Sequence, residues 1–259
     1  MEDITESKSR LGIEDPRQQA GQIISDSKNI YLITSDEPEA ITSTLALFYT
    51  LKELGKNVNL IIDTLPENLK FLAPSLDFIS YPKNFVISVP NDIAQISQIY
   101  YEKNNDALKI HLTLESGNIK KDNISFYFSE AKPDLIITIG VKDYQKELSS
   151  RLNSFGFLLD SPILNIDTLT SLSADNGQDN KKFGKINLLG DLSLTETVFT
   201  LIKDINEKLL KKEPAMCLLS GLVFYTGNFR NKLTAEIFQI ASDLMKNGAD
   251  LKIIIDNIK

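Results

Sequence analysis

Short apolar runs alternate along the chain with longer segments whose apolar residues recur at helical spacing. Residues 30–34 and 58–62 are two such runs, rich in β-branched residues and typical of strands buried on both faces. Between them, the leucines of residues 41–54 follow a helical period, and Gly55 ends this predicted helix. The order strand, helix, strand predicts a right-handed crossover and a parallel sheet.

The same pattern returns in the second half of the sequence. Further parallel strands are predicted at residues 134–139, 162–167 and 185–189. Amphipathic helices are predicted at residues 194–210 and 234–246, and a short helix at residues 18–25. Residues 217–224 are too short and apolar a segment for the period alone to decide between a strand and a buried helix.

An antiparallel pattern interrupts this order between residues 84 and 128. Residues 85–89 have the composition of a strand, and residues 96–101 and 108–114 flank the turn sequence Asn104-Asn105-Asp106. Apolar and polar residues alternate over 108–114, which predicts one buried and one solvated face. We expect residues 84–128 to form an antiparallel β insertion on the main sheet.

These elements define the expected organisation of the 259-residue chain. Residues 1–27 form an N-terminal segment with a short helix. Residues 28–259 form one α/β domain, a mainly parallel sheet flanked by helices with an antiparallel β-hairpin insertion. A chain of this length can bury a substantial core.

Composition limits the kinds of partner that we expect the protein to bind and the cell compartment in which we expect it. The net charge is −7, from 28 Lys and Arg against 35 Asp and Glu, so an extended nucleic-acid surface or an anionic-membrane surface is not expected. A small nucleotide held by a few local groups remains compatible with this charge. No apolar run reaches membrane-spanning length and the N-terminus lacks a signal-peptide core, so we expect a cytoplasmic protein.

Cysteine and histidine are too scarce for several common chemistries. Cys217 is the only cysteine and lies in an apolar run, which indicates a buried, inert thiol and excludes an intrachain disulfide. His111 is the only histidine and falls on the polar face of the predicted hairpin, where we expect a solvent-facing side chain. A histidine cluster for zinc is therefore excluded. Nucleophile-elbow, Walker-type and dinucleotide-binding glycine motifs are also absent from the sequence.

Several segments, taken in their order along the chain, carry a family resemblance. They are residues 45–47, 51–58, 65–72, 163–167, 183–188 and 219–221, then Thr226-Gly227-Asn228-Phe229-Arg230 and residues 241–250. Together they resemble the DHH phosphoesterase domain, in the branch that includes bacterial short-oligoribonuclease and nucleotide phosphatase enzymes. The resemblance runs from about residue 28 to the C-terminus and is interrupted by the β insertion.

The resemblance implies a two-metal active site that this chain lacks. In that family, His and Asp side chains at strand ends hold two Mn²⁺ or Mg²⁺ ions, and a metal-bound hydroxide attacks phosphorus. The first motif, His-x-x-Pro-Asp-Gly-Asp, stands here as Ser35-Asp36-Glu37-Pro38-Glu39-Ala40. The Asp-His-His signature reads Asp167-Thr168-Leu169. Two further aspartates of the family are replaced by Gly140 and Tyr225.

Asp167 alone keeps the identity that the family's motifs require, and no imidazole ligand remains. We therefore expect no catalytic residues, no metal centre and no cofactor, with Glu39 and Asp167 the remaining weak candidates for metal ligands. The resemblance also implies that the DHH-associated C-terminal domain is missing, because the sequence stops just after what resembles the linker helix.

Polar residues nevertheless gather beyond the predicted strand ends, where open α/β sheets bind ligands. The candidate residual pocket consists of Asp36, Glu39, Asp143, Asp167, Thr168, Asp191, Tyr225, Thr226 and Arg230. One interpretation is a pocket for a divalent ion or a nucleotide phosphate, with Tyr225 filling the old site or stacking on a base. In the other, the carboxylates cap helices and loops, and Arg230 bridges backbone or Asp167.

Two functional hypotheses follow. The first is a degenerate, non-enzymatic binding or scaffold protein that meets a protein partner, or a second copy, through the β insertion, where Tyr100, Tyr101 and the strand edges are available. The alternative is a Mn²⁺- or Mg²⁺-dependent phosphoesterase that acts on short oligonucleotides or nucleotide phosphates. It would use a rebuilt carboxylate site on Asp36, Glu39, Asp167 and Asp191.

Overall fold

The computed structural model describes residues 15–62, 65–73, 83–130, 132–142, 161–169 and 183–258. The chain divides into two compact units. The main unit consists of Met1–Tyr81 and Lys132–Lys259, and the insertion unit consists of Pro82–Ala131.

A five-stranded sheet with the order β2-β1-β7-β8-β9 forms the centre of the main unit. Its strands are β1 (Asn29–Thr34), β2 (Asn57–Ile61), β7 (Leu135–Ile139), β8 (Ile163–Thr168) and β9 (Ile186–Gly190). Every neighbouring pair is parallel, which confirms the predicted fold class. The three central strands are buried on both faces, as their continuous apolar runs predict.

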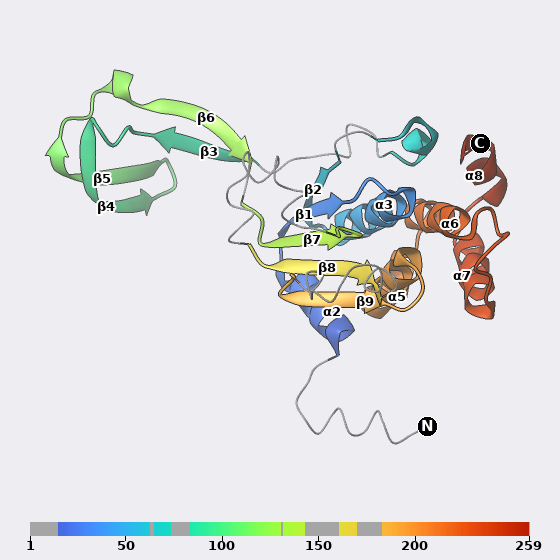
Figure 1. Ribbon diagram of the computed structural model, residues 1–259. Coiled ribbons are helices and arrows are strands. Elements are labelled where there is room, and N and C mark those ends of the chain that lie inside the picture. Colours follow the sequence, from blue (N-terminus) through green and yellow to red (C-terminus); the bar gives the residue numbers. More distant parts are fainter. Residues whose placement is uncertain are drawn as a thin grey trace, which may run out of the picture. The chain divides into compact units, whose positions relative to one another are not determined.

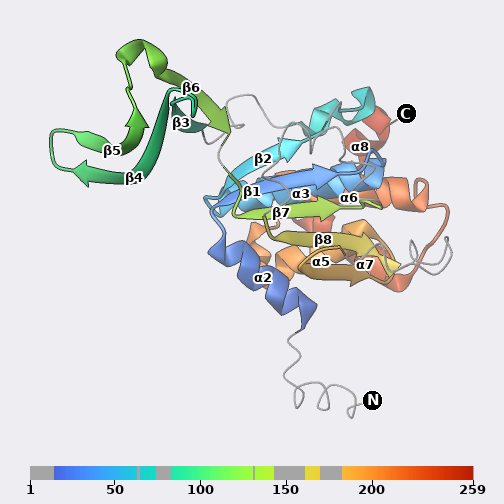
Figure 2. The same cartoon turned by 60° about the vertical axis from the view of Figure 1, so that its left-hand side comes forward.

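Helices pack on one face of this sheet (Figure 1, Figure 2). They are α2 (Pro16–Asp26), α3 (Pro38–Glu53), α5 (Leu194–Asn206), α6 (Lys212–Thr226), α7 (Ala235–Lys246) and α8 (Leu251–Ile258). Helices α3 and α5 pack on the sheet, α6 packs on them, and α7 and α8 pack on α6. Single 3₁₀ segments occur at η1 (Glu67–Leu72) and η6 (Glu207–Leu209). None of the described helices combines the length and apolar character that crossing a membrane requires.

Local sequence explains where these helices begin and end. Helix α3 begins at Pro38, three residues before the predicted start, because proline is favoured in the first turn, where its missing N–H is not needed. The undecided residues 217–224 belong to helix α6, which is buried nearly all round by its neighbours. The predicted helix 194–210 ends as an α-helix at Asn206 and continues as the single turn η6.

The insertion unit holds two antiparallel strand pairs (Figure 1). β3 (Lys83–Ser88) pairs with β6 (Ser125–Glu130), and β4 (Ala94–Lys103) pairs with β5 (Leu108–Gly117). The short segment η3 (Lys121–Asn123) precedes β6. The Asn104 side chain accepts hydrogen bonds from the amides of Asp106 and Ala107, at 3.1 and 2.8 Å, and so closes the predicted turn.

Two expectations for the insertion are wrong. The insertion was expected on the main sheet, but among the described strands it forms separate two-stranded sheets that exchange no hydrogen bonds with the parallel one. The apolar face of the hairpin was expected to be buried, but Leu108, Ile110 and Leu114 are 61%, 48% and 38% exposed. A two-stranded ribbon supplies no second layer of its own, so alternation in sequence cannot bury a face by itself.

Candidate functional site

Four neighbouring strands, β1, β7, β8 and β9, end together at the carboxyl edge of the main sheet. Ser35 follows β1, and its amide donates to the Ile139 carbonyl at 3.2 Å. Gly140 follows β7 and donates to the Ile166 carbonyl at 2.9 Å. Thr168 ends β8 beside the last residue of β9. This edge is where an α/β sheet of this type presents ligand-binding groups.

Glu39 lies in the first turn of α3, and its carboxylate is used by a neighbouring helix. Its Oε1 atom accepts hydrogen bonds from the Thr195 backbone N–H at 3.0 Å and the Thr195 hydroxyl at 3.2 Å. The carboxylate therefore caps the N-terminus of α5, where the helix dipole also favours negative charge. Burial raises the pKa of Glu39, while the Thr195 hydrogen bonds and the positive charge of Lys232 act in the opposite direction.

Gly140 occupies a position where a side chain has almost no room. A Cβ atom there would lie 3.0 Å from the Ala40 Cβ, 3.0 Å from the Leu194 Cδ1 and 3.1 Å from the Ser35 Oγ. The φ angle of Gly140 is also +66°, a conformation that favours glycine over residues with a Cβ. The main-chain path and the packing of α3 and α5 are therefore matched to glycine at this strand end.

Asp167 is 3% exposed and lies near the end of β8. Its Oδ1 accepts a hydrogen bond from the Thr168 amide at 2.8 Å. Side chains alternate along a strand, so Asp167 shares a face with Asn165, whereas Leu164 and Ile166 join the core under the helices. Asp167 and the α5-capping Glu39 thus belong to opposite sides of the sheet.

Tyr225 ends α6 close to Glu39, and a lysine covers its ring. The Lys232 ammonium lies 4.3 Å from the ring centroid, in cation–π geometry. Burial raises the pKa of the Tyr225 hydroxyl, and the negative charges of Glu39 and Glu196 add to this effect. Tyr225 was expected in the site, but Lys232 was not.

A turn of unusual conformation brings Lys232 back over Tyr225. Gly227, Asn228 and Phe229 have φ angles of +58°, +60° and +56°, and Lys232 has +53°. The Thr226 hydroxyl donates to the Leu222 carbonyl at 2.6 Å and accepts from the Phe229 amide at 2.9 Å, so Thr226 holds the turn together. The asparagine and glycine of this segment, which tolerate positive φ, were the available sequence signal.

The remaining predicted site residues are dispersed. Asp36, Asp191 and Arg230 are exposed, and the Arg230 side chain forms no hydrogen bond or ion pair with another residue in the described ranges. The expected bridge from Arg230 to Asp167 is therefore not seen. Asp143 lies outside the described residues.

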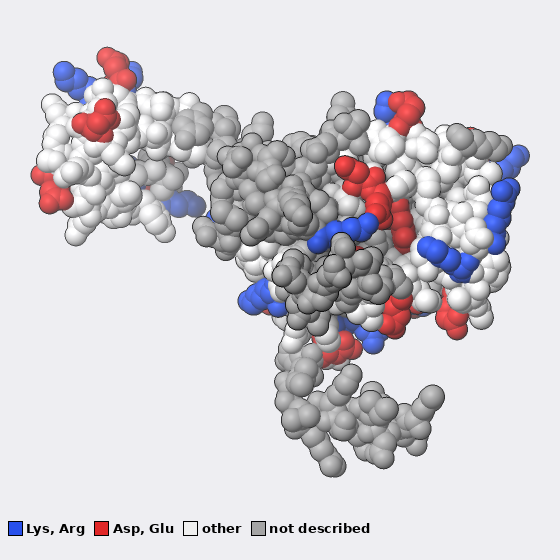
Figure 3. All heavy atoms as spheres, in the orientation of Figure 1, with Lys and Arg blue, Asp and Glu red and all other residues white. Residues whose placement is uncertain are grey.

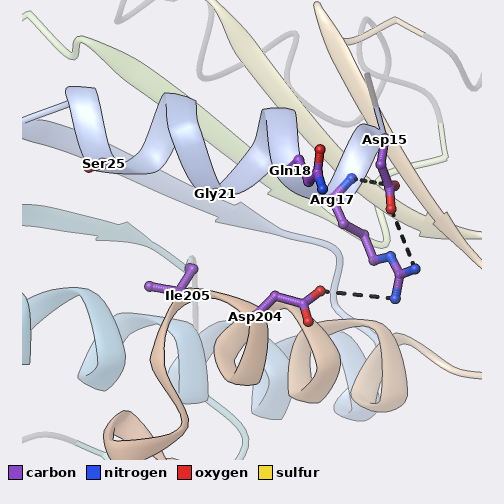
Figure 4. Close-up of a pocket in the computed structure, with 7 residues that line it drawn as sticks. All are labelled: Asp15, Arg17, Gln18, Gly21, Ser25, Asp204 and Ile205. Carbon is purple, nitrogen blue, oxygen red and sulfur yellow. Dashed lines mark hydrogen bonds and ion pairs between the residues drawn. The ribbon is translucent and has the colours of Figure 1, made fainter. Parts of the chain in front are cut away.

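Two surface grooves are bordered by helix α2. One, of about 450 Å³, is lined by the end of β9, the start of α5 and the start of α2, and includes Asp191 and Glu196. Burial and the charges of Asp191 and Glu236 raise the pKa of Glu196. The other, of about 560 Å³, lies between α2 and α5, where Arg17 bridges Asp15 at 3.5 Å and Asp204 at 4.0 Å (Figure 4). Neither groove is lined by Glu39, Asp167 or Tyr225.

The described side chains do not fit a two-metal centre of the DHH type. Within the described ranges, no three His, Cys, Asp or Glu side chains are grouped as metal ligands would be. Glycine and tyrosine stand at two positions where the resemblance places ligands, and Glu39 already accepts two hydrogen bonds from Thr195. Such a set offers Mn²⁺ or Mg²⁺ too few converging oxygen atoms.

Comparison with solved structures identifies the class of fold. The chain is similar to an exopolyphosphatase-related protein from Bacteroides fragilis, with a TM-score of 0.61, 19% identity, and coverage of 94% of this chain and 59% of that one. Exonuclease RecJ bound to manganese also matches, with a TM-score of 0.43, 12% identity, and coverage of 91% and 49%. No family model and no curated protein matches the sequence.

The fold is therefore that of a DHH phosphoesterase-like protein, as the order of motifs in the sequence implies. The chain spans about three fifths of the length of the exopolyphosphatase-related protein, 59%, and about half of RecJ, 49%. A shared fold does not carry an activity with it, so function must be argued from the site.

Proposed function

We propose that this chain is a catalytically degenerate DHH phosphoesterase-like protein that acts as a non-enzymatic binding or scaffold protein in the cytoplasm. The observation that carries this proposal is the packing around Gly140, where the resemblance places a metal-ligating aspartate. An aspartate would need its Cβ within 3.0 Å of Ala40 and Leu194, on a backbone with φ of +66°.

The surroundings of Gly140 have adapted to the smaller residue. Leu194 is 5% exposed and Ala40 is 0% exposed, so apolar side chains fill the volume that a ligand and its metal would use. Restoring the aspartate would require the side chains of Ala40, Leu194 and Ser35 each to give by a few tenths of an ångström, and close-packed interiors yield little. Loss of a ligand accompanied by repacking supports a fold kept for a purpose other than that chemistry.

Glu39 supports the same proposal through a different contact. Its Oε1 already accepts two hydrogen bonds from Thr195. Turning this carboxylate toward a metal would leave the Thr195 amide in the first turn of α5 without its acceptor, at a cost of about 1–3 kcal/mol, although Ser193 would still cap the helix.

We assign partner recognition to the insertion unit, because eight of the thirteen exposed large hydrophobic side chains in the described ranges lie there. The main unit then serves as the folded support.

Calorimetric titration of the metal-stripped full chain with Mn²⁺ tests this function. We expect no binding up to millimolar Mn²⁺, for the wild type, for Asp167→Ala, and for the control Asp92→Ala, which removes an exposed carboxylate of the insertion unit. Micromolar binding of two ions that Asp167→Ala abolishes and Asp92→Ala preserves would overturn the proposal. That result would favour the metal-dependent phosphoesterase, and hydrolysis of short oligonucleotides would then be measured with the same variants.

A further inference from the structure

The two faces of the β4–β5 hairpin differ in how their side chains are partnered. Directly opposite residues share a face, and the register pairs Ile99 with Leu112, Tyr101 with Ile110, and Lys103 with Leu108. The alternate pairs lie on the other face. We call the first the apolar hairpin face and the second the polar hairpin face.

Side chains on the polar hairpin face pair with one another across the two strands. The rings of Tyr100 and His111 stack, with centroids 4.6 Å apart and an interplanar angle of 2°. The Glu102 carboxylate lies 3.8 Å from the Lys109 ammonium and 3.8 Å from the His111 Nε2. Such cross-strand pairs are typical of a face that remains in water.

The apolar hairpin face exposes large side chains along its whole length. The most exposed are Ile99 at 70%, Tyr101 at 74%, Leu108 at 61%, Ile110 at 48% and Leu114 at 38%. Among the pairs that form this face, Lys103 is the one charged residue, and no carboxylate interrupts it. On the side of this unit that Figure 3 shows, uncharged atoms cover much of the surface between a few groups of Lys, Asp and Glu atoms.

Exposure of the apolar hairpin face to water is energetically unfavourable. A two-stranded ribbon is marginally stable unless a face is packed, so the hairpin itself gains from being covered. The five side chains expose apolar area on the order of 500 Å², which is near the upper end for the largest patch of a monomer.

That area matches what one subunit contributes to a stable dimer. A standard interface buries about 800 Å² on each partner, and about 65% of the surface is apolar in homodimers, or roughly 520 Å². Two copies of the apolar hairpin face would therefore meet the requirement without any other surface. A two-fold axis brings the same patch together from both copies, so one apolar face suffices.

The distribution of charge along the chain also favours contact between two copies through the insertion unit. The insertion unit carries five lysines and six carboxylates, a net charge of −1, so −6 of the total −7 belongs to the rest of the chain. Two identical acidic chains repel least where their charge is lowest. We propose that two copies of this chain pack the apolar faces of their β4–β5 hairpins against each other around a two-fold axis.

Sedimentation velocity of the full chain tests the dimer, with one variant on each face of strand β5. Ile110→Glu places a carboxylate in the apolar hairpin face, and Thr113→Glu places it at an exposed position of the polar hairpin face as the matched control. We expect a wild-type dimer at micromolar concentration, a dissociation constant at least about 30-fold higher for Ile110→Glu, and little change for Thr113→Glu. A wild-type monomer at about 100 μM, or equal weakening by both variants, would contradict the proposal.

Disulfide trapping between copies gives a second readout that does not depend on a charged variant folding. Cys217 is buried, and burial raises the pKa of its thiol, so an introduced cysteine would be the reactive one. We expect Tyr101→Cys to form covalent dimers much faster than Tyr100→Cys, its neighbour on the polar hairpin face. Equal rates would overturn the arrangement. Neither experiment involves metal or catalysis, so failure here leaves the proposed function standing, and the reverse also holds.

Discussion

The main unit and the insertion unit use similar apolar residues with opposite results. In the main unit, Ile30 and Leu32 lie on the face of β1 that α3 covers, and both are 0% exposed. In the insertion unit, Ile99 and Leu108 are 70% and 61% exposed. The difference arises from layering, since α3 and α5 cover the parallel sheet, while a two-stranded hairpin has no layer of its own. The apolar pattern of a strand or helix predicts which of its faces is buried, but not which other element covers that face.

The two units also differ in the contacts that their polar side chains make. At the carboxyl edge of the main sheet, Glu39 and Thr226 are committed to a helix start and a helix end. In the insertion unit, Glu102 and His111 interact across two strands in partial contact with water. At this edge of the main sheet these polar groups serve the fold, whereas those of the insertion unit remain in partial contact with water.

Truncating one apolar side chain in each unit should give the largest contrast. Leu32→Ala removes a side chain buried between the sheet and its helices, so we expect a loss of about 2–5 kcal/mol in the free energy of unfolding. Ile99→Ala removes a side chain that is already in water in the single chain, so the main unit should unfold within about 0.5 kcal/mol of the wild type. Urea denaturation monitored by circular dichroism measures both.

Repeating both unfolding measurements at several protein concentrations provides the control for this pair of variants. If the hairpins pack between copies, the effect of Ile99→Ala should grow as the protein is concentrated, because folding and association are then coupled, whereas the Leu32→Ala effect should stay constant. Equal destabilisation by the two variants in dilute protein would mean that the hairpin is buried within its own chain.

A glycine pair tests how closely the main unit is packed, with a smaller expected effect. A Cβ on Gly221 of α6 would lie 2.4 Å from the Thr195 Oγ1 and 2.9 Å from the Thr42 Oγ1, so Gly221→Ala should cost about 1–3 kcal/mol. Gly21 of α2 has no atom within 4 Å of the same position. Gly21→Ala should therefore stabilise the fold by about 0.4–1 kcal/mol. Thermal unfolding compares them, and a neutral Gly221→Ala would disprove the close approach of α6 to α3 and α5.

The smallest expected effect concerns the pH dependence at Glu39. Burial raises the pKa of Glu39 in the folded state above its ordinary value of 4.5, so the folded state binds this proton more tightly than the unfolded state. The stabilisation is fully present below pH 4.5 and is lost as the pH rises through the folded pKa. Glu39→Gln keeps the oxygen that accepts from Thr195 but cannot ionise.

The wild type should consequently lose stability relative to Glu39→Gln as the pH rises from 4.5, with no further change above the folded pKa. Urea denaturation of both proteins at a series of pH values measures the difference. A gap of constant size, or one that widens in favour of the wild type, would show that the carboxylate of Glu39 is not destabilised by burial.

The local structure could be predicted from the sequence because residue identity and short-range spacing determine it. The apolar runs located all five parallel strands to within one or two residues, and Asn104 marked the hairpin turn. The order of motifs implied the fold, and reading their positions one by one showed Gly140 and Tyr225 where the family has ligands. These are properties of residue identity and short-range spacing, which a single sequence displays directly.

Tertiary structure alone decided what those residues do. The tight surroundings of Gly140, the α5 cap formed by Glu39, and the Lys232 ammonium over Tyr225 all join residues far apart in the chain or brought together by an unusual turn. The exposed hairpin face was missed for the same reason. Periodicity records which side of an element is apolar, whereas burial depends on whether another layer reaches that side, and only the folded chain fixes which elements meet.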